Sequence, residues 1–323
     1  MNAPYAPGVP DVTVPPQLSR ADADLTWRPP HALDMRATLG RLGRGPGDPT
    51  HQFAADGGIW RTARTADGPA TAYLRQVDRS TVTCHAWGPG AGAMISGVPD
   101  LLGARDDHTD FAPQLPAVAE AHRLHPGLRT PRTGYVLDSL MAAVFEQRVI
   151  TVDAQAAWRR LIRRHGDLAP GPAPAGMRLP LSPAQWVAIP SWEWHKAGVD
   201  ARRARTAIAC AHAAKRVEEA ASMSCAAAQA RLMAIPGVGA WTAAEVAQRA
   251  LGDADAVSVG DYHLAASIGW TFVGRPVDDA EMLTILEEFR PFRYRVVRLL
   301  QLTGRLTKPR FGPRATRDTS NLR

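Results

Sequence analysis

The chain has 323 residues, the length of about two average domains. Hydrophobic residues make up 45% of it and charged residues 21%, which is typical of a globular protein and excludes a disordered or fibrous chain. No run of about 18 apolar residues occurs, so we expect no membrane span. The N-terminus has no secretory signal pattern, and three distant cysteines fit a reducing compartment, so we expect a cytoplasmic protein.

The formal net charge of +7 is unevenly distributed along the chain. Residues 289–323 contain ten basic residues and a single acidic one, Asp318, whereas the preceding residues are slightly acidic in sum. A genome rich in GC would favour arginine over lysine, but it would not remove the acids from this block. The block therefore indicates a polyanionic partner such as nucleic acid.

The N-terminal third predicts a small α+β domain behind a short tail. Residues 1–21 are rich in proline, and we expect them to be a disordered tail. Residues 22–112 follow as the α+β domain, because short β-branched or aromatic segments alternate with Asp, Gly and Pro turns. Its expected strands are 25–28, 58–63, 71–77 and 80–87, and its expected helices are 32–43 and 92–103.

After residue 112 the strand pattern disappears and helical periodicity takes over. We expect an all-α domain over residues 113–308, a loop rich in Pro, Gly and Ala over 168–183, and a basic tail over 309–323. The fold class is therefore α+β overall, a small α+β domain followed by a helical one. The expected helices surround 137–145 and cover 152–165, 201–221, 226–234, 240–251, 260–268, 279–289 and 291–306.

The most specific motif is Pro236-Gly237-Val238-Gly239 between two short helices. Its glycines permit a tight turn and leave backbone N–H groups exposed at the start of the second helix, where a phosphate can bind. A plain helical hairpin within a bundle is the alternative interpretation. About twenty residues later Asp261 stands at the start of another predicted helix.

This hairpin followed by an aspartate resembles the helix–hairpin–helix (HhH-GPD) superfamily of DNA glycosylases. The segments 125–129 and 145–150 and the arginine-rich final helix further resemble its AlkA-like branch, DNA-3-methyladenine glycosylase II. The resemblance covers about residues 22–308 and implies that the helical domain has two lobes with the active site between them.

The resemblance implies that Asp261 is the catalytic carboxylate, which would stabilise positive charge on the sugar while the bond to the base breaks. An ordinary helix cap is the alternative for this residue. Trp241 stands where bifunctional relatives carry a Schiff-base lysine, so we expect no AP-lyase activity. No cysteine follows Cys225, so we expect no iron–sulfur cluster; in relatives a monovalent cation is held by hairpin carbonyls, and no other metal or cofactor is expected.

The expected partner is double-stranded DNA with a damaged base, which must leave the helix to reach the site. Arg148 follows Gln147 at the position of the inserted wedge, although a solvated arginine at a helix end is an equal alternative. Phosphate contacts are expected from the hairpin and the last helix. The expected DNA-binding residues are Pro236, Gly237, Val238, Gly239, Trp241, Thr242, Gln147, Arg148, Arg298 and Arg305.

The base pocket is expected to depart from the relatives' aromatic lining. Glu245 lies one turn after Trp241, and Gln301 lies in the last helix. An acid and an amide could recognise a cationic alkylated base or a lesion that forms hydrogen bonds. Trp192 and Trp194 are included as stacking residues, with packing in the core as the alternative.

We therefore expect a monomeric, monofunctional glycosylase that releases alkylated purines, such as 3-methyladenine and 7-methylguanine, by base flipping and so initiates base excision repair. In a bacterium it would be associated with the nucleoid. One alternative keeps the fold and changes the lesion to hypoxanthine or to oxidised or bulky adducts. The other is a DNA-binding helix–hairpin–helix protein without catalysis.

Overall fold

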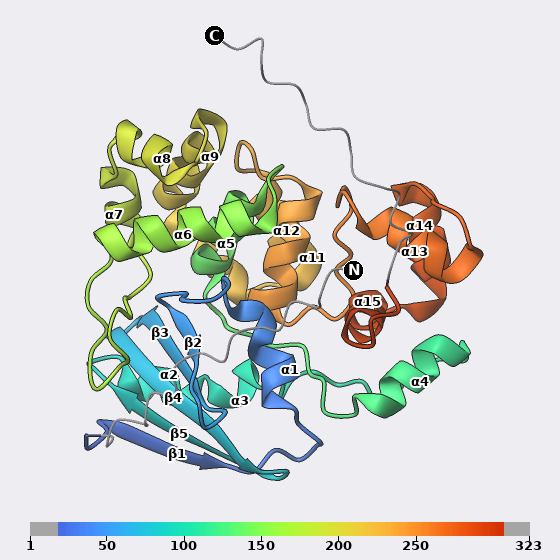
Figure 1. The fold of residues 1–323 in the computed structure, drawn as a ribbon, viewed down its shortest axis with the longest axis horizontal. Helices are drawn as coiled ribbons and strands as arrows, with labels where there is room; N and C mark the ends of the chain where they lie inside the picture. The colour runs from blue at the N-terminus through green and yellow to red at the C-terminus, as the bar shows by residue number, and fades with distance from the viewer. Residues whose placement is uncertain (1–18, 307–323) are drawn as a thin grey trace, which may run out of the picture.

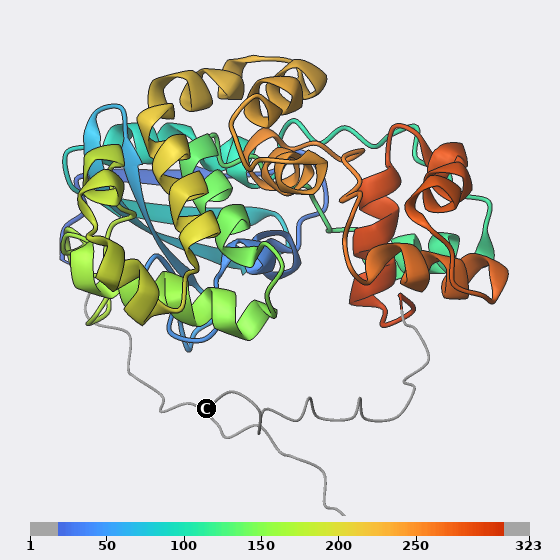
Figure 2. The same ribbon diagram turned by 90° about the horizontal axis from the view of Figure 1, so that it is seen from above.

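The computed structural model describes residues 19–306, which form one sheet domain and two helical lobes (Figures 1 and 2). The expected tail 309–323 and all but the last residues of the expected tail 1–21 lie outside the described residues. In the described part of the chain, no helix is both long enough and apolar enough to cross a bilayer. The expected α+β class is confirmed, with a five-stranded sheet among many helices.

The sheet is antiparallel throughout, in the order β1-β5-β4-β3-β2. Alternate residues of its strands face helices α1 and α2, so Ile59, Leu74 and Cys84 are fully buried on this side. The expected strands are present, and the short edge strand β2 is an addition. The strands are β1 (Ala23–Trp27), β2 (His51–Phe53), β3 (Ile59–Thr65), β4 (Gly68–Asp78) and β5 (Thr81–Trp87).

The two helices expected in this domain are shorter than their patterns suggested. Asp34 caps α1 by accepting a hydrogen bond from the Ala37 N–H, and the helix tightens into a 3₁₀ turn after Leu39. The expected helix 92–103 is two helices, divided at Gly97. The bounds are α1 (Met35–Leu39), η1 (Gly40–Leu42), α2 (Ala91–Ser96) and α3 (Val98–Leu101).

The opposite face of the sheet is covered by the loop that was expected over residues 168–183. Trp60, Tyr73 and Trp87 form an aromatic cluster on that face with Met177 of the loop. The loop passes so close that a Cβ on Gly171 would lie 2.4 Å from Cγ of Trp87. The long loop therefore packs closely on this face of the sheet and connects the sheet domain to the helices.

The first helical lobe is built around α5, whose central residues are buried on all sides. Phe145 packs in its core against the rings of Trp158, Trp186 and Trp194. Helices α7 and α8 were not expected, and the expected helix 201–221 is broken near Ala213. The elements are α5 (Val136–Glu146), α6 (Thr151–His165), α7 (Pro183–Ala188), α8 (Ser191–Ala197), α9 (Ala201–His212), α10 (Ala214–Glu218), η2 (Glu219–Ser222), α11 (Cys225–Met233), α12 (Ala240–Val246) and the π-helical turn η3 (Ala247–Leu251).

The second lobe combines the last helices with one from the middle of the chain. Helix α4, which was not expected, lies against α15 and contributes Val118 and Ala121 to a core shared with Leu286 and Leu299 (Figure 1). A helix of the second lobe, α4, therefore precedes the whole of the first lobe in the sequence. The elements are α4 (Pro116–Leu124), α13 (Leu264–Val273), α14 (Asp279–Leu286), η4 (Glu287–Phe289) and α15 (Arg293–Leu302).

Candidate active site

An open cleft of about 1810 Å³ lies between the two lobes. Its lining from the lobes includes the turn between α5 and α6, the start of α9, the hairpin with α12 and η3, the loop 256–264 and helix α15. A further segment, containing Arg41 and Arg44, comes from the sheet domain. The sheet domain is therefore part of the cleft wall as well as a scaffold.

The hairpin is held against α9 by a close backbone approach. Gly237 has φ +90, a left-handed backbone that glycine adopts readily. A Cβ there would lie 2.1 Å from Oγ1 of Thr206, so the close contact also requires a residue without a side chain. The N–H of Val238 donates to the carbonyl of Ile235 at 3.0 Å, and the Val238 side chain is buried. Gly239, by contrast, is extended and has open space at its Cβ position.

The turn after α5 is tied to the hairpin by one amide. Gln147 Nε2 donates to the carbonyl of Gly237 at 3.0 Å and to Oγ1 of Thr242 at 2.9 Å. The next residue, Arg148, is exposed on the cleft wall and has φ +58, a left-handed backbone that non-glycine residues rarely adopt. Gln147 and Arg148 thus both line the cleft beside the hairpin.

Asp261 faces the cleft, and both of its carboxylate oxygens are held in place. Oδ1 accepts the backbone N–H groups of His263 and Leu264 at 2.8 and 2.9 Å, where α13 begins. Oδ2 accepts the indole N–H of Trp241 at 3.2 Å. Asp261 therefore does act as a helix cap. Its carboxylate also accepts a hydrogen bond from the helix after the hairpin and lines the cleft, so capping is not its only interaction.

Glu245 lines the cleft on the inner side, as expected, but its charge is already balanced. Oε1 accepts the Ser258 hydroxyl at 2.5 Å, and Oε2 accepts Arg249 at 2.5 Å and Arg41 at 3.4 Å. Burial alone would raise the pKa of this carboxyl, but the charges of Arg249 and Arg41 and the hydrogen bonds lower the pKa to about 2. Glu245 is therefore ionised and fully engaged with its neighbours.

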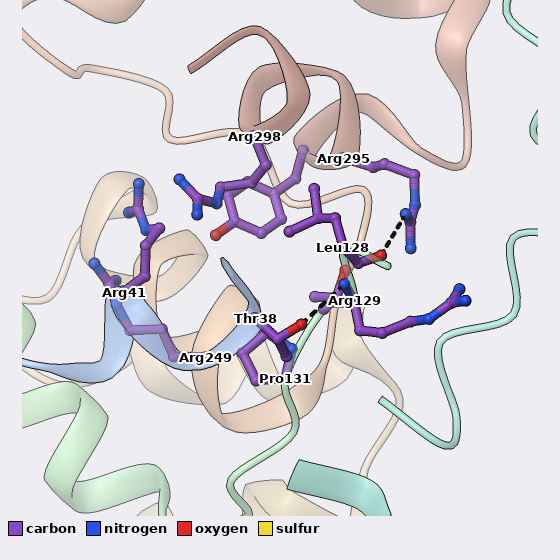
Figure 3. A pocket seen from close by; sticks show the side chains of 10 residues that line it. Thr38, Arg41, Leu128, Arg129, Pro131, Arg249, Arg295 and Arg298 are labelled. Carbon is purple, nitrogen blue, oxygen red and sulfur yellow. Dashed lines mark hydrogen bonds between the residues drawn. The ribbon is translucent and has the colours of Figure 1, made fainter. Parts of the chain in front are cut away.

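Gln301 also lines the cleft and joins the last helix to the sheet domain. Its Oε1 accepts Arg298 at 2.9 Å and Arg41 at 3.3 Å. Figure 3 shows the side chains of Arg41, Arg249 and Arg298 converging from three elements around a small pocket beside the cleft. Arg41 was not predicted from the sequence; it lies in a stretch at 40–47 that contains four glycines and two arginines.

Four of the expected site residues lie outside the lining of the open cleft: Trp194, Trp192, Arg305 and Arg298. Trp194 is 1% exposed and stacks on Trp186 with ring centroids 5.7 Å apart, so it belongs to the core and not to a base pocket. Trp192 is exposed on α8 and does not line the cleft. Arg305 is ion-paired with Glu120 of α4 outside the cleft lining.

Arg298 is half-buried in the small pocket behind Gln301 and does not line the open cleft, so its expected phosphate contact is not supported. Burial, with the charges of Arg41 and Arg249, lowers the pKa of Arg298 to about 10. Among the described residues, no group of three or more His, Cys, Asp or Glu could hold a metal ion.

Comparison with known proteins gives structural relatives only. No family model matches the chain, and no curated protein matches it in sequence. MBOgg1 in complex with a low-affinity DNA ligand superimposes with a TM-score of 0.70 at 15% identity, over 89% of this chain and 97% of that one. The 3-methyladenine DNA glycosylase of Archaeoglobus fulgidus gives a TM-score of 0.70 at 15% identity, over 85% and 96%.

A third structure, the Clostridium acetobutylicum 8-oxoguanine glycosylase/lyase in complex with double-stranded DNA, gives a TM-score of 0.70 at 11% identity. That match spans 89% of this chain and 97% of the other. Two of these structures name different bases, 3-methyladenine and 8-oxoguanine, so the likeness does not choose a substrate. The chain has the fold of the helix–hairpin–helix DNA glycosylases.

Proposed function

We propose that this protein is a monofunctional DNA glycosylase, which hydrolyses the N-glycosidic bond of a flipped, damaged nucleotide in duplex DNA. The observation that carries the proposal is the hydrogen bond from Trp241 to Asp261 in the cleft lining, with the hairpin beside them. A carboxylate held by three N–H donors at the edge of an open cleft is positioned to stabilise positive charge on a deoxyribose C1′. The same carboxylate can orient the attacking water.

The remaining cleft residues fit the other steps of this reaction. The hairpin backbone at Gly237–Gly239 would hold a phosphate, and Arg148 would fill the space left by the extruded base. Neither described lysine, Lys196 or Lys215, lines the cleft, which supports hydrolysis by water without a Schiff base. A monovalent cation at the hairpin carbonyls remains an expectation from the resemblance.

The lesion class expected from the sequence is the alkylated purine. Such bases are good leaving groups because they already carry positive charge, so hydrolysis would need no strong general acid. Base release from 3-methyladenine and 7-methylguanine duplexes is therefore part of the first assay, alongside hypoxanthine and 8-oxoguanine duplexes.

Single-turnover base release by the wild type and by Asp261→Asn tests the proposal. Asparagine retains the capping hydrogen bonds of Asp261 but not its charge, so we expect release to slow by about 10² to 10³-fold while duplex affinity and fold persist. Asp67→Asn, at an exposed turn of the sheet domain, is the matched control and should behave as the wild type. Borohydride should trap no covalent adduct.

Salt-sensitive duplex binding without release of any base in the panel would reject catalysis and leave the DNA-binding alternative. A borohydride-trapped adduct would reject the monofunctional mechanism while leaving glycosylase activity in place.

A further inference from the structure

The inner wall of the cleft presents hydrogen-bond donors to a ligand, because its acceptors are already occupied. Both oxygens of Glu245 accept short hydrogen bonds, from Ser258 and Arg249 at 2.5 Å each, and Arg41 adds a third donor at 3.4 Å. An ionised carboxylate has acceptor capacity only, and the charge of this one is balanced by Arg249. Glu245 is therefore unable to offer an unbalanced negative charge to a cationic base.

The orientation of Gln301 adds to this donor character. Its Oε1 accepts from both Arg298 and Arg41, at 2.9 and 3.3 Å. Guanidinium groups donate and never accept, so these two contacts fix which end of the amide is the oxygen. The amide nitrogen, with two hydrogens, is then the end of Gln301 left for a ligand in the cleft.

Arg41 is held loosely for a residue so close to the base site. Its two side-chain hydrogen bonds are long, 3.3 and 3.4 Å, and they reach two different partners, while its guanidinium lies 6.0 Å from the centre of the Tyr294 ring. Its Nε is buried and lacks a hydrogen-bond partner among the described residues. A planar guanidinium in this state can exchange two weak contacts for the bidentate pair that it forms best with oxygen acceptors.

The charges around the wall also disfavour a cationic base. Arginines outnumber carboxylates among the described residues that line the cleft. Arg44 lies buried next to Arg249, and burial together with that neighbouring charge lowers the pKa of Arg44. A base made cationic by alkylation of a ring nitrogen would enter this environment as a like charge, whereas a neutral base would not.

We infer that the cleft selects an uncharged flipped base that carries exocyclic carbonyl oxygens, and that Arg41, supplied by the sheet domain, is the residue that recognises those oxygens. This inference rests on the proposed glycosylase function and replaces the alkylated purine with a neutral, oxygen-bearing base as the preferred substrate. It also gives the N-terminal domain a direct part in specificity.

The test compares single-turnover base release from duplexes that contain 8-oxoguanine, hypoxanthine or 7-methylguanine, each expressed relative to its uncatalysed rate. We expect an enhancement at least about tenfold larger for one of the two neutral bases than for the cationic 7-methylguanine. A larger enhancement for 7-methylguanine would overturn the inference and leave the glycosylase function standing. Release of none of the three, nor of 3-methyladenine, would overturn both.

Variants of Arg41 then separate recognition from general DNA binding. Arg41→Gln should slow release of the preferred neutral base at least about tenfold and leave 3-methyladenine, which has no carbonyl oxygen, within about twofold, so that selectivity falls. Arg41→Lys, which retains the charge but loses the planar fork, should be intermediate. Arg123→Gln, at an exposed position of α4 outside the cleft lining, is the matched control.

Affinity for an undamaged duplex gives the second readout for the same variants. We expect it to change by less than about twofold in Arg41→Gln. Equal slowing of all bases, or a loss of affinity for undamaged DNA as large as the loss of rate, would assign Arg41 to the fold or to the phosphate backbone and overturn the inference. Thermal midpoints of the variants identify a folding defect.

Discussion

The hairpin at 235–242 and the inner wall around Glu245 face the same cleft but are assembled in opposite ways. The hairpin is one contiguous segment whose shape depends on Gly237 and a backbone hydrogen bond. The wall is formed by side chains from three elements, and Arg41 reaches partners 204 and 260 residues away in the sequence. The hairpin works through backbone groups near the surface, whereas the wall works through buried charges.

This difference implies different sensitivities. A local turn tolerates changes in its surroundings so long as Gly237 remains, because its geometry is set within a few residues. A buried ion-pair network depends on every member, because removal of one leaves an uncompensated charge. Under the proposed function, the hairpin would bind a DNA phosphate and the wall would select the base.

Breaking the wall should have the largest effect on stability. Glu245→Gln leaves the buried Arg249 with only the more distant carboxylate of Glu146, at 3.9 Å, to balance its charge, so we expect the free energy of unfolding at pH 7 to fall by about 3 kcal/mol. Urea denaturation measures it. Glu219→Gln, which breaks the exposed pair with Arg231, is the control and should cost less than about 1 kcal/mol.

The same variant has a pH signature. The folded pKa of Glu245, about 2, lies below its ordinary value of 4.5, so its stabilisation is complete above the ordinary value. It is lost as the pH falls through the folded value. The difference in stability between wild type and Glu245→Gln should therefore narrow as the pH falls from about 5 to about 2, the range that spans the ordinary and the folded pKa of Glu245. A difference independent of pH would contradict an ionised Glu245 in the folded protein.

The hairpin should respond to its backbone geometry rather than to charge. Gly237→Ala places a Cβ against Thr206 and keeps φ at +90, and we expect a loss of about 1 to 3 kcal/mol. Gly239→Ala is the matched control two residues away, since its φ is −107 and its Cβ position is open. Equal losses in the two variants, measured by thermal unfolding, would show that the close approach to α9 is not what fixes the turn.

The smallest effect is expected at the link between the hairpin and the turn after α5. Gln147→Ala removes the hydrogen bonds to Gly237 and Thr242, for a loss of about 1 kcal/mol. Gln147→Glu should be no better, because a carboxylate cannot donate to the Gly237 carbonyl. Wild-type stability in Gln147→Glu, in urea at pH 7, would argue against the donor role of this amide.

The contrast between the two regions also explains what the sequence could predict. The hairpin and Asp261 form a compact pattern, and the amphipathic helix expected at 152–165 is confirmed within one residue as α6. Helices α4 and α7 were missed because each begins at a proline, Pro116 or Pro183, in a segment with few periodic residues. Such prolines resemble loop signals unless the first helical turn is considered.

The side chains of the wall were harder to predict than the elements that carry them. Glu245 and Gln301 were expected at the pocket, but the contacts that Arg41 makes with both of them join the sheet domain to the helical lobes and leave no local pattern in the sequence. The tryptophan pair was ambiguous for a related reason. A run of aromatic residues does not show which face a helix buries, and in α8 the packing against Trp186 and Phe145 decides it.

The second lobe is assembled from two segments that are synthesised at different times. Residues 111–128, including α4, leave the ribosome before α5, but their apolar partners over 257–300 emerge only after the first lobe has been synthesised. The sheet domain and the first lobe can fold as they emerge, because domains generally fold in order from the N-terminus. The apolar face of α4 must wait for α13, α14 and α15, so the side of the cleft that carries Asp261 is completed after the first lobe.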